Sequence, residues 1–328
     1  KKGQVEQVNN GEVQQEEKEQ PKLKIVNQNS KSRPYAVMIN NNHAAWPQCG
    51  IGDAYIVYEI VAEGGITRMM ALYKDQDTAK IGSIRSARHY FLDYALENDA
   101  IYVHYGWSPQ AQSDISSLGV DNINGIYESE SAFWRVDDKY APHNAVTSTK
   151  DILEIADRKG YRVDKEKDNV LNYVVAEVNL EDGKIADDVV IPYSDYNEVE
   201  YIYDEDLKEY VRYSRGEKQV DWNSGETITT KNIIIEKAEN WTLNDGSGKG
   251  RQTLDNVTTL EGYYITNGKV IEITCEKESR SGQTVYKDLE GNEINVNDGK
   301  TFIQICPINA DITCLLYTSP SPRDISGS

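Results

Sequence analysis

Four stretches in the first half of the chain are apolar at nearly every position, and each has the length of a strand. Continuous apolar runs of this length are typical of strands buried on both faces, so we expect them to form the middle of a sheet. The Gly64-Gly65 pair between the second and third runs predicts a tight hairpin. The runs cover residues 34–40, 54–63, 66–74 and 100–106.

Three further segments, residues 88–97, 108–119 and 148–160, repeat their apolar residues with the spacing of a helix. A capping box that begins at Ser148 marks the start of the third helix, and Gly160 closes it. Each helix is expected to bury one stripe of apolar side chains. The stripes are Phe91, Leu92, Ala95 and Leu96 in the first helix, and Ile152, Leu153, Ile155 and Ala156 in the third.

Beyond residue 165 the pattern changes to short β-type runs joined by turns. Asp-Gly, Gly-Asn or Asn-Gly pairs separate these runs, and such pairs are the strongest short-range signal for a hairpin. The candidate hairpins cover residues 179–186, 263–273, 289–294 and 296–305. The predicted fold is an α/β (or α+β) N-terminal domain with a mixed sheet, residues 33–165, packed against a β-rich C-terminal domain, residues 166–313.

Both ends of the chain differ in composition from the part between them. Residues 1–32 are rich in Gln, Glu, Lys and Asn and precede the first aromatic residue, Tyr35, so we expect a disordered polar tether. Residues 314–328 match neither the period nor the chemistry of the strand-like run before them. They resemble the in-frame translation of a sequencing adapter, and we interpret them as an artefact.

Composition narrows the class of protein. Of 328 residues, 38% are hydrophobic and 27% are charged, and no apolar run reaches the length of about 18 residues that a membrane helix needs. The net charge of -19 argues against nucleic acid as a partner, because broad binding to nucleic acid requires a basic surface. The cysteines lack metal-ligand spacing, which disfavours structural zinc, and Cys275 and Cys306 are candidates for a disulfide.

In this acidic chain, one basic group stands out where the first helix begins, in IGSIRSARHYFLDYALE, residues 81–97. If Ser86 caps the helix, Arg88 and His89 lie in its first turn and Arg85 lies just before it. Cations there oppose the positive end of the helix dipole, so a negative group should offset them. That group is either a bound anion, such as a phosphate or carboxylate, or an internal carboxylate.

The internal candidates are Glu59, Glu63 and Asp93. Arg68, on a strand close in sequence, can point either to the ligand or to Glu63. The two interpretations differ in what a substitution of Arg85 would do. Loss of an anion site would leave the fold intact, whereas loss of a buried pair would destabilise it.

Two histidines are candidates for acid–base chemistry. His104 ends a predicted strand, and His143 lies in APHNAV beside Asn144. Either can also be a hydrogen-bonded structural residue. We predict no cofactor, although the two histidines with Glu63 leave room for a divalent metal. The segment GSGKGR, residues 246–251, lacks the spacing of a phosphate-binding P-loop, so we interpret it as a polar turn.

Several long segments resemble the DUF3048 family, the YerB-type lipoproteins of Gram-positive bacteria. RPYAVMINNNHAAWPQCGIGDAYIVYEIVAEGGITRMMALY, KIGSIRSARHYFLDYALENDAIYVHYGWSP and APHNAVTS are similar to its N-terminal domain. YIYDEDLKEYVRYSRGEKQVDWNSGETITTKNIII, GSGKG and GKTFIQICP are similar to its C-terminal domain. The family usually has proline where this chain has Ser83, which predicts a less rigid loop, and a small residue where it has Cys49.

The resemblance implies a protein that is lipid-anchored at the outer face of the bacterial cytoplasmic membrane. It implies no particular activity, and whether the chain is an enzyme stays open. Our leading hypothesis is that Arg68, Arg85 and Arg88, with His104, His143 and Asn144 beside them, bind an anionic envelope glycan or lipid-linked precursor. A shorter resemblance, in the order of two strands, Ile-x-Arg and a helix, is to envelope phosphotransferases of the LytR-CpsA-Psr type, whose arginines bind a pyrophosphate.

Two alternatives remain open. The first is a glycan-modifying phosphotransferase or hydrolase that uses His104 or His143, with Glu63 as a further catalytic candidate. The second is a scaffold that binds cell-wall synthesis proteins through residues 166–313.

Overall fold

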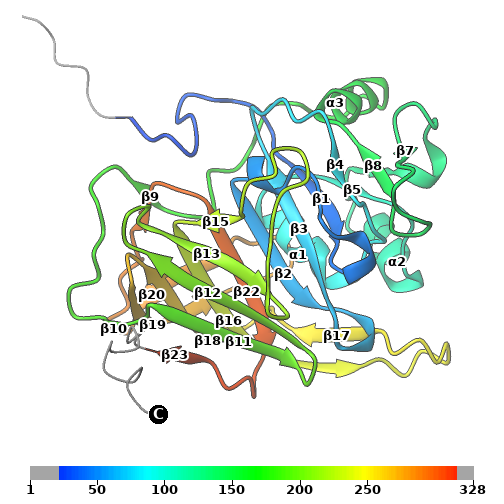
Figure 1. Cartoon of the computed structure of the whole chain (residues 1–328). Coiled ribbons are helices and arrows are strands. Elements are labelled where there is room, and N and C mark those ends of the chain that lie inside the picture. Colours follow the sequence, from blue (N-terminus) through cyan, green and yellow to red (C-terminus); the bar gives the residue numbers. More distant parts are fainter. Residues whose placement is uncertain (1–21, 316–328) are drawn as a thin grey trace, which may run out of the picture.

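One large mixed sheet runs through the computed structural model, which describes residues 22–315 (Figure 1). Its twelve strands follow the order β10-β19-β18-β16-β22-β2-β3-β1-β5-β6, with β17 paired to β16 and β20 paired to β19. The strands from the first half are β1 (Tyr35–Asn40), β2 (Ile56–Val61), β3 (Thr67–Tyr73), β5 (Ile101–His104) and β6 (Asn122–Asn124). Those from the second half are β10 (Lys184–Ile185), β16 (Asn232–Thr242), β17 (Gln252–Asp255), β18 (Thr259–Thr266), β19 (Lys269–Glu276), β20 (Val285–Asp288) and β22 (Thr301–Pro307).

The predicted fold class is confirmed. The first half has a mixed sheet with three helices, and the second half consists largely of antiparallel strands. The four apolar runs form β1, β2, β3 and β5, and Gly64 and Gly65 lie in the short turn that makes an antiparallel hairpin of β2 and β3. Every residue of β1, β2 and β3 is buried, as continuous apolar runs predict.

The three predicted helices are α1 (His89–Glu97), α2 (Pro109–Ser117) and α3 (Thr149–Arg158). Ser148 caps α3 as predicted, because its hydroxyl oxygen accepts a hydrogen bond from the Asp151 N–H. The predicted stripe of α3 is wrong at one position: Ile152, Ile155 and Ala156 are buried, but Leu153 is 48% exposed. None of the helices in residues 22–315 combines the length and the hydropathy needed to span a membrane.

A second, antiparallel sheet of six strands has the order β14-β13-β12-β11-β23, with β15 paired to β13. It packs on the large sheet through a buried ion pair, in which the Arg212 guanidinium donates to Glu59 Oε2 over 2.6 Å. Both side chains are 0% exposed. The strands are β11 (Asp188–Ser194), β12 (Asn197–Asp204), β13 (Glu209–Ser214), β14 (Glu217–Lys218), β15 (Thr229–Thr230) and β23 (Thr313–Leu315).

The remaining elements are short. Two small sheets consist of β4 (Ile81–Gly82), β8 (Ala145–Thr147) and β7 (Trp134–Arg135), and of β21 (Val296–Asn297) and β9 (Tyr173–Val174). Single turns of 3₁₀-helix are η1 (His43–Ala45), η2 (Ile51–Asp53), η3 (Glu63–Gly65) and η4 (Gly125–Tyr127).

Two of the four hairpin predictions are confirmed. β18 and β19 form a hairpin around Asn267 and Gly268, both with positive φ, and β20 folds back through the turn at Gly291. The other two are wrong. Residues 179–186 place β10 against β19, and residues 296–305 place β21 against β9 and β22 against β2 and β16. The chain turns at Asp182 and bends at Asp298, but in each case the next strand pairs with a distant partner.

The residues at both ends of the described part pack or pair with the folded part of the chain. The expected tether is shorter than residues 1–32, because residues 22–32 lie on the folded part: the Lys24 and Ile25 N–H groups donate to the Asp298 carboxylate, and Val26 is 4% exposed. Residues 1–21 lie outside the described residues. Of the predicted tail, Cys314 and Leu315 pair with β11, and residues 316–328 lie outside the described residues.

The disulfide prediction is wrong. Cys275 and Cys306 are both free and buried, and two strands, β18 and β16, separate β19 from β22. Burial raises the pKa of the Cys306 thiol to about 12, so this thiol is unreactive near neutral pH.

Candidate anion-binding site

Four cationic side chains and one carboxylate meet at a cavity of about 370 Å³. Three of the segments around it come from the first half of the chain and the fourth comes from the loop between β16 and β17. The lining residues are Glu63, Arg85, Ser86, Arg88, Trp107, Ser108, Lys249 and Arg251.

The two central segments, residues 85–88 and 105–108, are fixed to each other by their backbones. The Tyr105 N–H donates to the Arg85 carbonyl, the Ala87 N–H to the Gly106 carbonyl and the Ser108 N–H to the Ala87 carbonyl. The first of these segments precedes α1 and the second precedes α2, so both helices begin at this cavity. The arginine side chains therefore extend from a backbone that is already held in place.

Glu63 is the internal partner of two arginines. Arg88 Nε donates to its Oε1 over 2.5 Å, and Arg68 Nη2 lies 3.4 Å from its Oε2. Burial would raise the pKa of Glu63, but the hydrogen bond from Arg88 and the charge of Arg68 outweigh it, so the pKa is lowered. For Arg68 and Arg88 the internal pairing is thus present, with Glu63 and with neither Glu59 nor Asp93, which bind Arg212 and Arg280.

Arg68 lies behind the cavity rather than in its wall. Its side chain is 7% exposed, and its Nη1 donates to the Ser86 carbonyl over 2.7 Å. Burial, together with the charge of Arg88, lowers its pKa to about 10. The side chain holds the loop before α1 and the carboxylate of Glu63 in place.

Arg85 differs from both neighbours. Its backbone N–H donates to the Met38 carbonyl, but across residues 22–315 its guanidinium has no hydrogen bond or ion pair. Burial, followed by the nearby charge of Arg88, lowers the pKa of Arg85, because both oppose its positive charge. Five donors of a half-buried guanidinium therefore have no protein acceptor in the described part of the chain.

The start of α1 is not where the sequence placed it. Ser86 does not cap the helix, because its hydroxyl donates to the Tyr105 carbonyl and the N-cap residue is Arg88, which has no side-chain capping bond. His89 faces away from the cavity lining, and its Nε2 is 2.8 Å from the Thr253 hydroxyl on β17. The backbone of residues 85–88 is held by residues 105–108 instead of by a capping side chain.

The loop between β16 and β17 brings the two cations that sequence reasoning missed. The prediction of a polar turn at residues 246–251 is confirmed, since Gly246, Gly248 and Gly250 all have positive φ in the tip of this hairpin. Arg251 donates to Asp245 over 2.6 Å, and the Lys249 ammonium has no hydrogen bond or ion pair with any described residue. The signal in the sequence was the pair of basic residues itself, but nothing local indicates what the turn faces.

His104 does not reach the cavity. It is 0% exposed, with Nδ1 2.7 Å from the Gly106 carbonyl and Nε2 3.0 Å from Asn122 Oδ1, so both ring nitrogens are occupied. Burial lowers its pKa, and the ring supports the indole of Trp107 at 5.4 Å between centroids. The geometry gives His104 a structural position behind the wall of the cavity.

Neither His143 nor Asn144 lines the cavity, although His143 is close enough to Arg85 to be affected by its charge. His143 Nδ1 accepts from the Asn40 amide over 3.0 Å, and its Nε2 has no partner in residues 22–315. Burial and then the charge of Arg85 lower its pKa, so the ring is neutral at neutral pH. Asn144 uses both ends of its amide to hold the loop at residues 135–139, through Arg135 and the carbonyls of Val136 and Lys139.

Ser83 stands where the resemblance led us to expect proline, and hydrogen bonds hold the loop that contains it. The Ser83 hydroxyl donates to the His143 carbonyl, and the Ser83 side chain is buried. Among residues 22–315 no three or more His, Cys, Asp or Glu side chains gather closely enough to hold a metal ion, so Glu63, His104 and His143 form no ligand set.

The charges of the lining residues distinguish this cavity from a larger one on the second half of the chain. A cavity of about 530 Å³ on the second half is lined by four carboxylates and one lysine, which repel an anion. These are Asp182, Lys184, Glu272, Asp288 and Glu290. The arginine cavity, in contrast, combines several cations with a guanidinium that has no partner among residues 22–315.

Comparison with known proteins identifies the family of this chain. Residues 22–162 match the N-terminal domain, and residues 189–303 the C-terminal domain, of a protein family of unknown function, DUF3048. The chain belongs to the DUF3048 family. In the curated proteins it is 34% identical over 299 residues to the "Putative lipoprotein YerB" of Bacillus subtilis (strain 168), across 87% of this chain and 84% of that protein.

The fold is likewise that of a solved DUF3048 structure. The crystal structure of YerB protein from Bacillus subtilis superposes with a TM-score of 0.77 at 33% identity, covering 86% of this chain and 94% of that one. Because it covers 86% of this chain, the match extends over both halves.

Proposed function

We propose that this protein is lipid-anchored at the outer face of the bacterial cytoplasmic membrane and binds an anionic ligand of the cell envelope in the arginine cavity. The observation that supports binding is the guanidinium of Arg85, which is half-buried beside Lys249 and has no acceptor among residues 22–315. The name of the relative, a lipoprotein, supports the location.

The positive charges that line the cavity favour binding of an anion, although the chain as a whole is negatively charged. The net charge of -19 repels anions at long range, but salt screens such interactions beyond about 8 Å at physiological ionic strength. Within the cavity, Arg85, Arg88, Lys249 and Arg251 face one lining carboxylate, Glu63. The electrostatic potential inside the cavity is therefore positive.

The donors indicate the chemistry of the ligand. A guanidinium has planar paired N–H groups that match a phosphate or a carboxylate, and a phosphate can bridge the guanidinium to the Lys249 ammonium. The Ser86 and Ser108 side chains also line the cavity. A phosphate-bearing glycan or lipid-linked precursor provides such a group at the membrane surface.

His143 supports one alternative, an enzyme that modifies this ligand. Its ring is neutral at neutral pH, its Nε2 has no partner in the described part of the chain, and it lies close enough to Arg85 to feel its charge. A general base needs a free nitrogen of this kind. Turnover of a lipid-linked glycan that disappears in His143→Ala while binding persists would support this alternative, and unchanged turnover would exclude His143 as the base.

A thermal-shift titration tests binding. The chain and Arg85→Ala are titrated with pyrophosphate, teichoic-acid fragments and lipid-linked glycan analogues, with and without divalent metal. A ligand that binds the native state raises the melting temperature by mass action. We expect at least one of these ligands to raise it for the wild type and not for Arg85→Ala.

The matched control is Lys150→Ala, which removes one positive charge at a side chain that is 77% exposed and outside the cavity. It should keep the full shift. Equal shifts for Arg85→Ala and the wild type would contradict the proposal, as would no shift with any ligand.

A further inference from the structure

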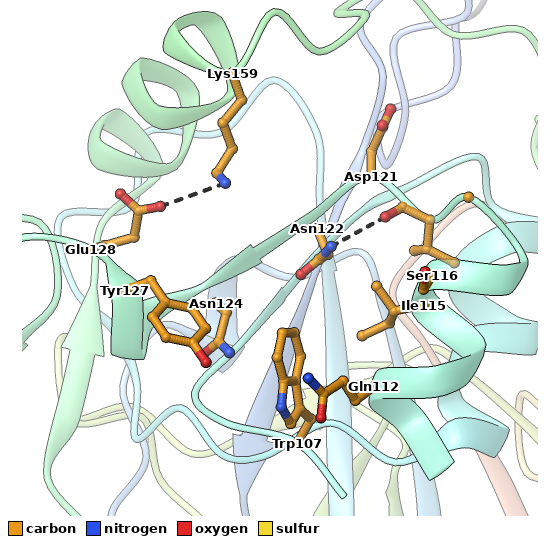
Figure 2. Close-up of a pocket in the computed structure, with 12 residues that line it drawn as sticks. Trp107, Gln112, Ile115, Ser116, Asp121, Asn122, Asn124, Tyr127, Glu128 and Lys159 are labelled. Carbon is orange, nitrogen blue, oxygen red and sulfur yellow. Dashed lines mark hydrogen bonds and ion pairs between the residues drawn. The ribbon is translucent and has the colours of Figure 1, made fainter. Parts of the chain in front are cut away.

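A second cavity, of about 590 Å³, lies next to the arginine cavity and shares Trp107 with it. It opens between α2, β6 and η4, and Figure 2 shows aromatic and amide side chains pointing into it. Its volume is in the range of sites for small organic ligands, about 300–1,000 Å³.

Two aromatic rings form one wall. The Trp107 and Tyr127 ring centroids are 6.0 Å apart at an interplanar angle of 55°, so the two faces form an open angle. Tyr127 is 72% exposed, and Trp107 is supported from behind by the buried His104. A large ring that is exposed at the rim of a cavity offers apolar surface to a ligand.

An unpartnered amide lies beside these rings. Asn124 is 5% exposed, and its Oδ1 accepts from the Gly106 and Ile126 N–H groups, which fixes the direction of its Nδ2. That Nδ2 is buried and has no hydrogen-bond partner among the described residues. Figure 2 shows the amide next to the Tyr127 ring, on the side that faces Trp107. A buried donor without an acceptor is costly, so a bound acceptor would stabilise it.

The charged groups of this cavity are already paired. Glu128 contacts Lys159 at 3.9 Å and also binds Arg158, and Asp121 binds Arg33. The polar groups that remain for a ligand are neutral amides, such as Asn124 and Gln112. The cavity therefore favours a neutral ligand over an ionic one.

A sugar ring has the complementary chemistry. One of its faces presents C–H groups, which pack against the negative face of an aromatic ring, and its hydroxyl groups accept from amide donors. We propose that this aromatic cavity binds a neutral sugar of the same glycan whose anionic group occupies the arginine cavity, with Trp107 between the two. The inference rests on the proposed function and names its ligand class: a phosphorylated glycan.

Isothermal titration calorimetry of the full chain with two neutral disaccharides, N,N′-diacetylchitobiose and maltose, tests the sugar site. At least one should bind the wild type, and Tyr127→Ala should weaken it about tenfold or more. Tyr196→Ala, at a tyrosine that is 62% exposed and outside both cavities, should bind as the wild type does. Arg85→Ala should also bind the disaccharide normally.

If neither disaccharide binds up to about 10 mM, or if binding is the same in Tyr127→Ala, the sugar site is refuted. Pyrophosphate titrated into the same proteins separates this failure from failure of the proposed function. Pyrophosphate that binds in an Arg85-dependent way while the disaccharides do not bind leaves the anion site standing and overturns the sugar site. If pyrophosphate and the other anionic ligands of the thermal-shift titration all fail to bind, the anion site is refuted whatever the disaccharides do.

Discussion

At the scale of single residues, the arginines of the cavity divide into two kinds. Arg68 and Arg88 use their guanidinium groups on Glu63 and on backbone carbonyls, and Arg251 uses its own on Asp245. Arg85 has no such partner in residues 22–315, so its donors are available to the ligand that we propose. Side chains of one type, a few residues apart, thus have different tasks because their acceptors differ.

This division predicts that substitutions of Arg68 and Arg85 change the stability of the fold to different extents. Arg68→Ala leaves the Glu63 carboxylate and the Ser86 carbonyl short of a donor, so it should lower the free energy of unfolding by about 2–3 kcal/mol. Arg85→Ala breaks no hydrogen bond of the described residues and should change it by less than about 0.5 kcal/mol. Urea denaturation of both variants measures the difference, and a strongly destabilised Arg85→Ala would indicate a structural role.

Glu236 predicts a dependence of stability on pH. It is 1% exposed, and burial, followed by the charge of Glu97, raises its pKa from 4.5 to about 7, while Tyr94 and Tyr286 donate to it. Between these two pH values the folded state holds a proton that the unfolded state has lost. The free energy of unfolding should therefore fall as the pH rises from about 4.5 to about 7, by about 3 kcal/mol in total.

Glu236→Gln removes the titrating group and isolates this contribution. The difference in unfolding free energy between Glu236→Gln and the wild type should grow by about 2.5 kcal/mol between pH 5 and pH 8. Urea denaturation at both pH values gives that difference. Parallel pH profiles for the two proteins would show that Glu236 does not titrate in this range.

At the scale of elements, the hairpin of β16 and β17 completes the cavity from the second half of the chain. Its tip is tied to α2 by the Gln110 amide, which donates to Asp245 over 3.3 Å, and it presents Lys249 and Arg251. Outside β16 and β17, no other hydrogen bond or ion pair joins residues 243–251 to the rest of the described chain. Its glycines allow the turn, and its two cations face the arginines before α1.

Shortening this hairpin should separate binding from folding. A variant that joins Thr242 to Gln252 through Asn-Gly removes both cations and keeps the pairing of β16 with β17. We expect its affinity for pyrophosphate to fall about tenfold or more, with a melting temperature close to that of the wild type. An unchanged affinity, measured by calorimetry, would exclude the hairpin from the site.

Helices and strands were predictable from the sequence where the local pattern determines them. The partners of strands and side chains from distant parts of the chain were not. The apolar runs that became β1, β2 and β3 and the capping box at Ser148 are local signals, and Arg85 and Arg88 stood out against an acidic chain. Lys249 and Arg251 could not be placed there, because their position depends on the parallel pairing of β22 with both β2 and β16. The burial of His104 also depends on distant contacts, because β5 lies between β1 and β6 in the sheet. The hydrogen bonds of Asn144, in contrast, are to residues only five to nine positions before it.

At the scale of the whole molecule, β22 connects the two halves. It comes from the end of the chain, yet it lies between β2 of the first half and β16 of the second. The buried pair of Glu59 and Arg212 adds a second connection, between the two large sheets. Removing either half would expose a sheet edge and leave a buried charge without its partner.

The chain should consequently unfold in one step. Tryptophans lie in both halves, so fluorescence and circular dichroism should report coincident urea transitions. Residues 33–165 produced alone should lack a cooperative transition, since β2 would lose its neighbour β22. Two separate transitions, or a stable fragment, would show that the halves fold independently.

The central claim is that the guanidinium of Arg85 contacts the anion. Nitrogen-15 NMR of arginine Nε–H groups tests it directly, with the Arg85 signal identified by its absence in Arg85→Ala and Arg212, a fully buried arginine, as the internal reference. On addition of pyrophosphate we predict that the Arg85 signal shifts in a saturable way while the Arg212 signal stays in place. An Arg85 signal that does not move at concentrations where other arginine signals do would contradict the account.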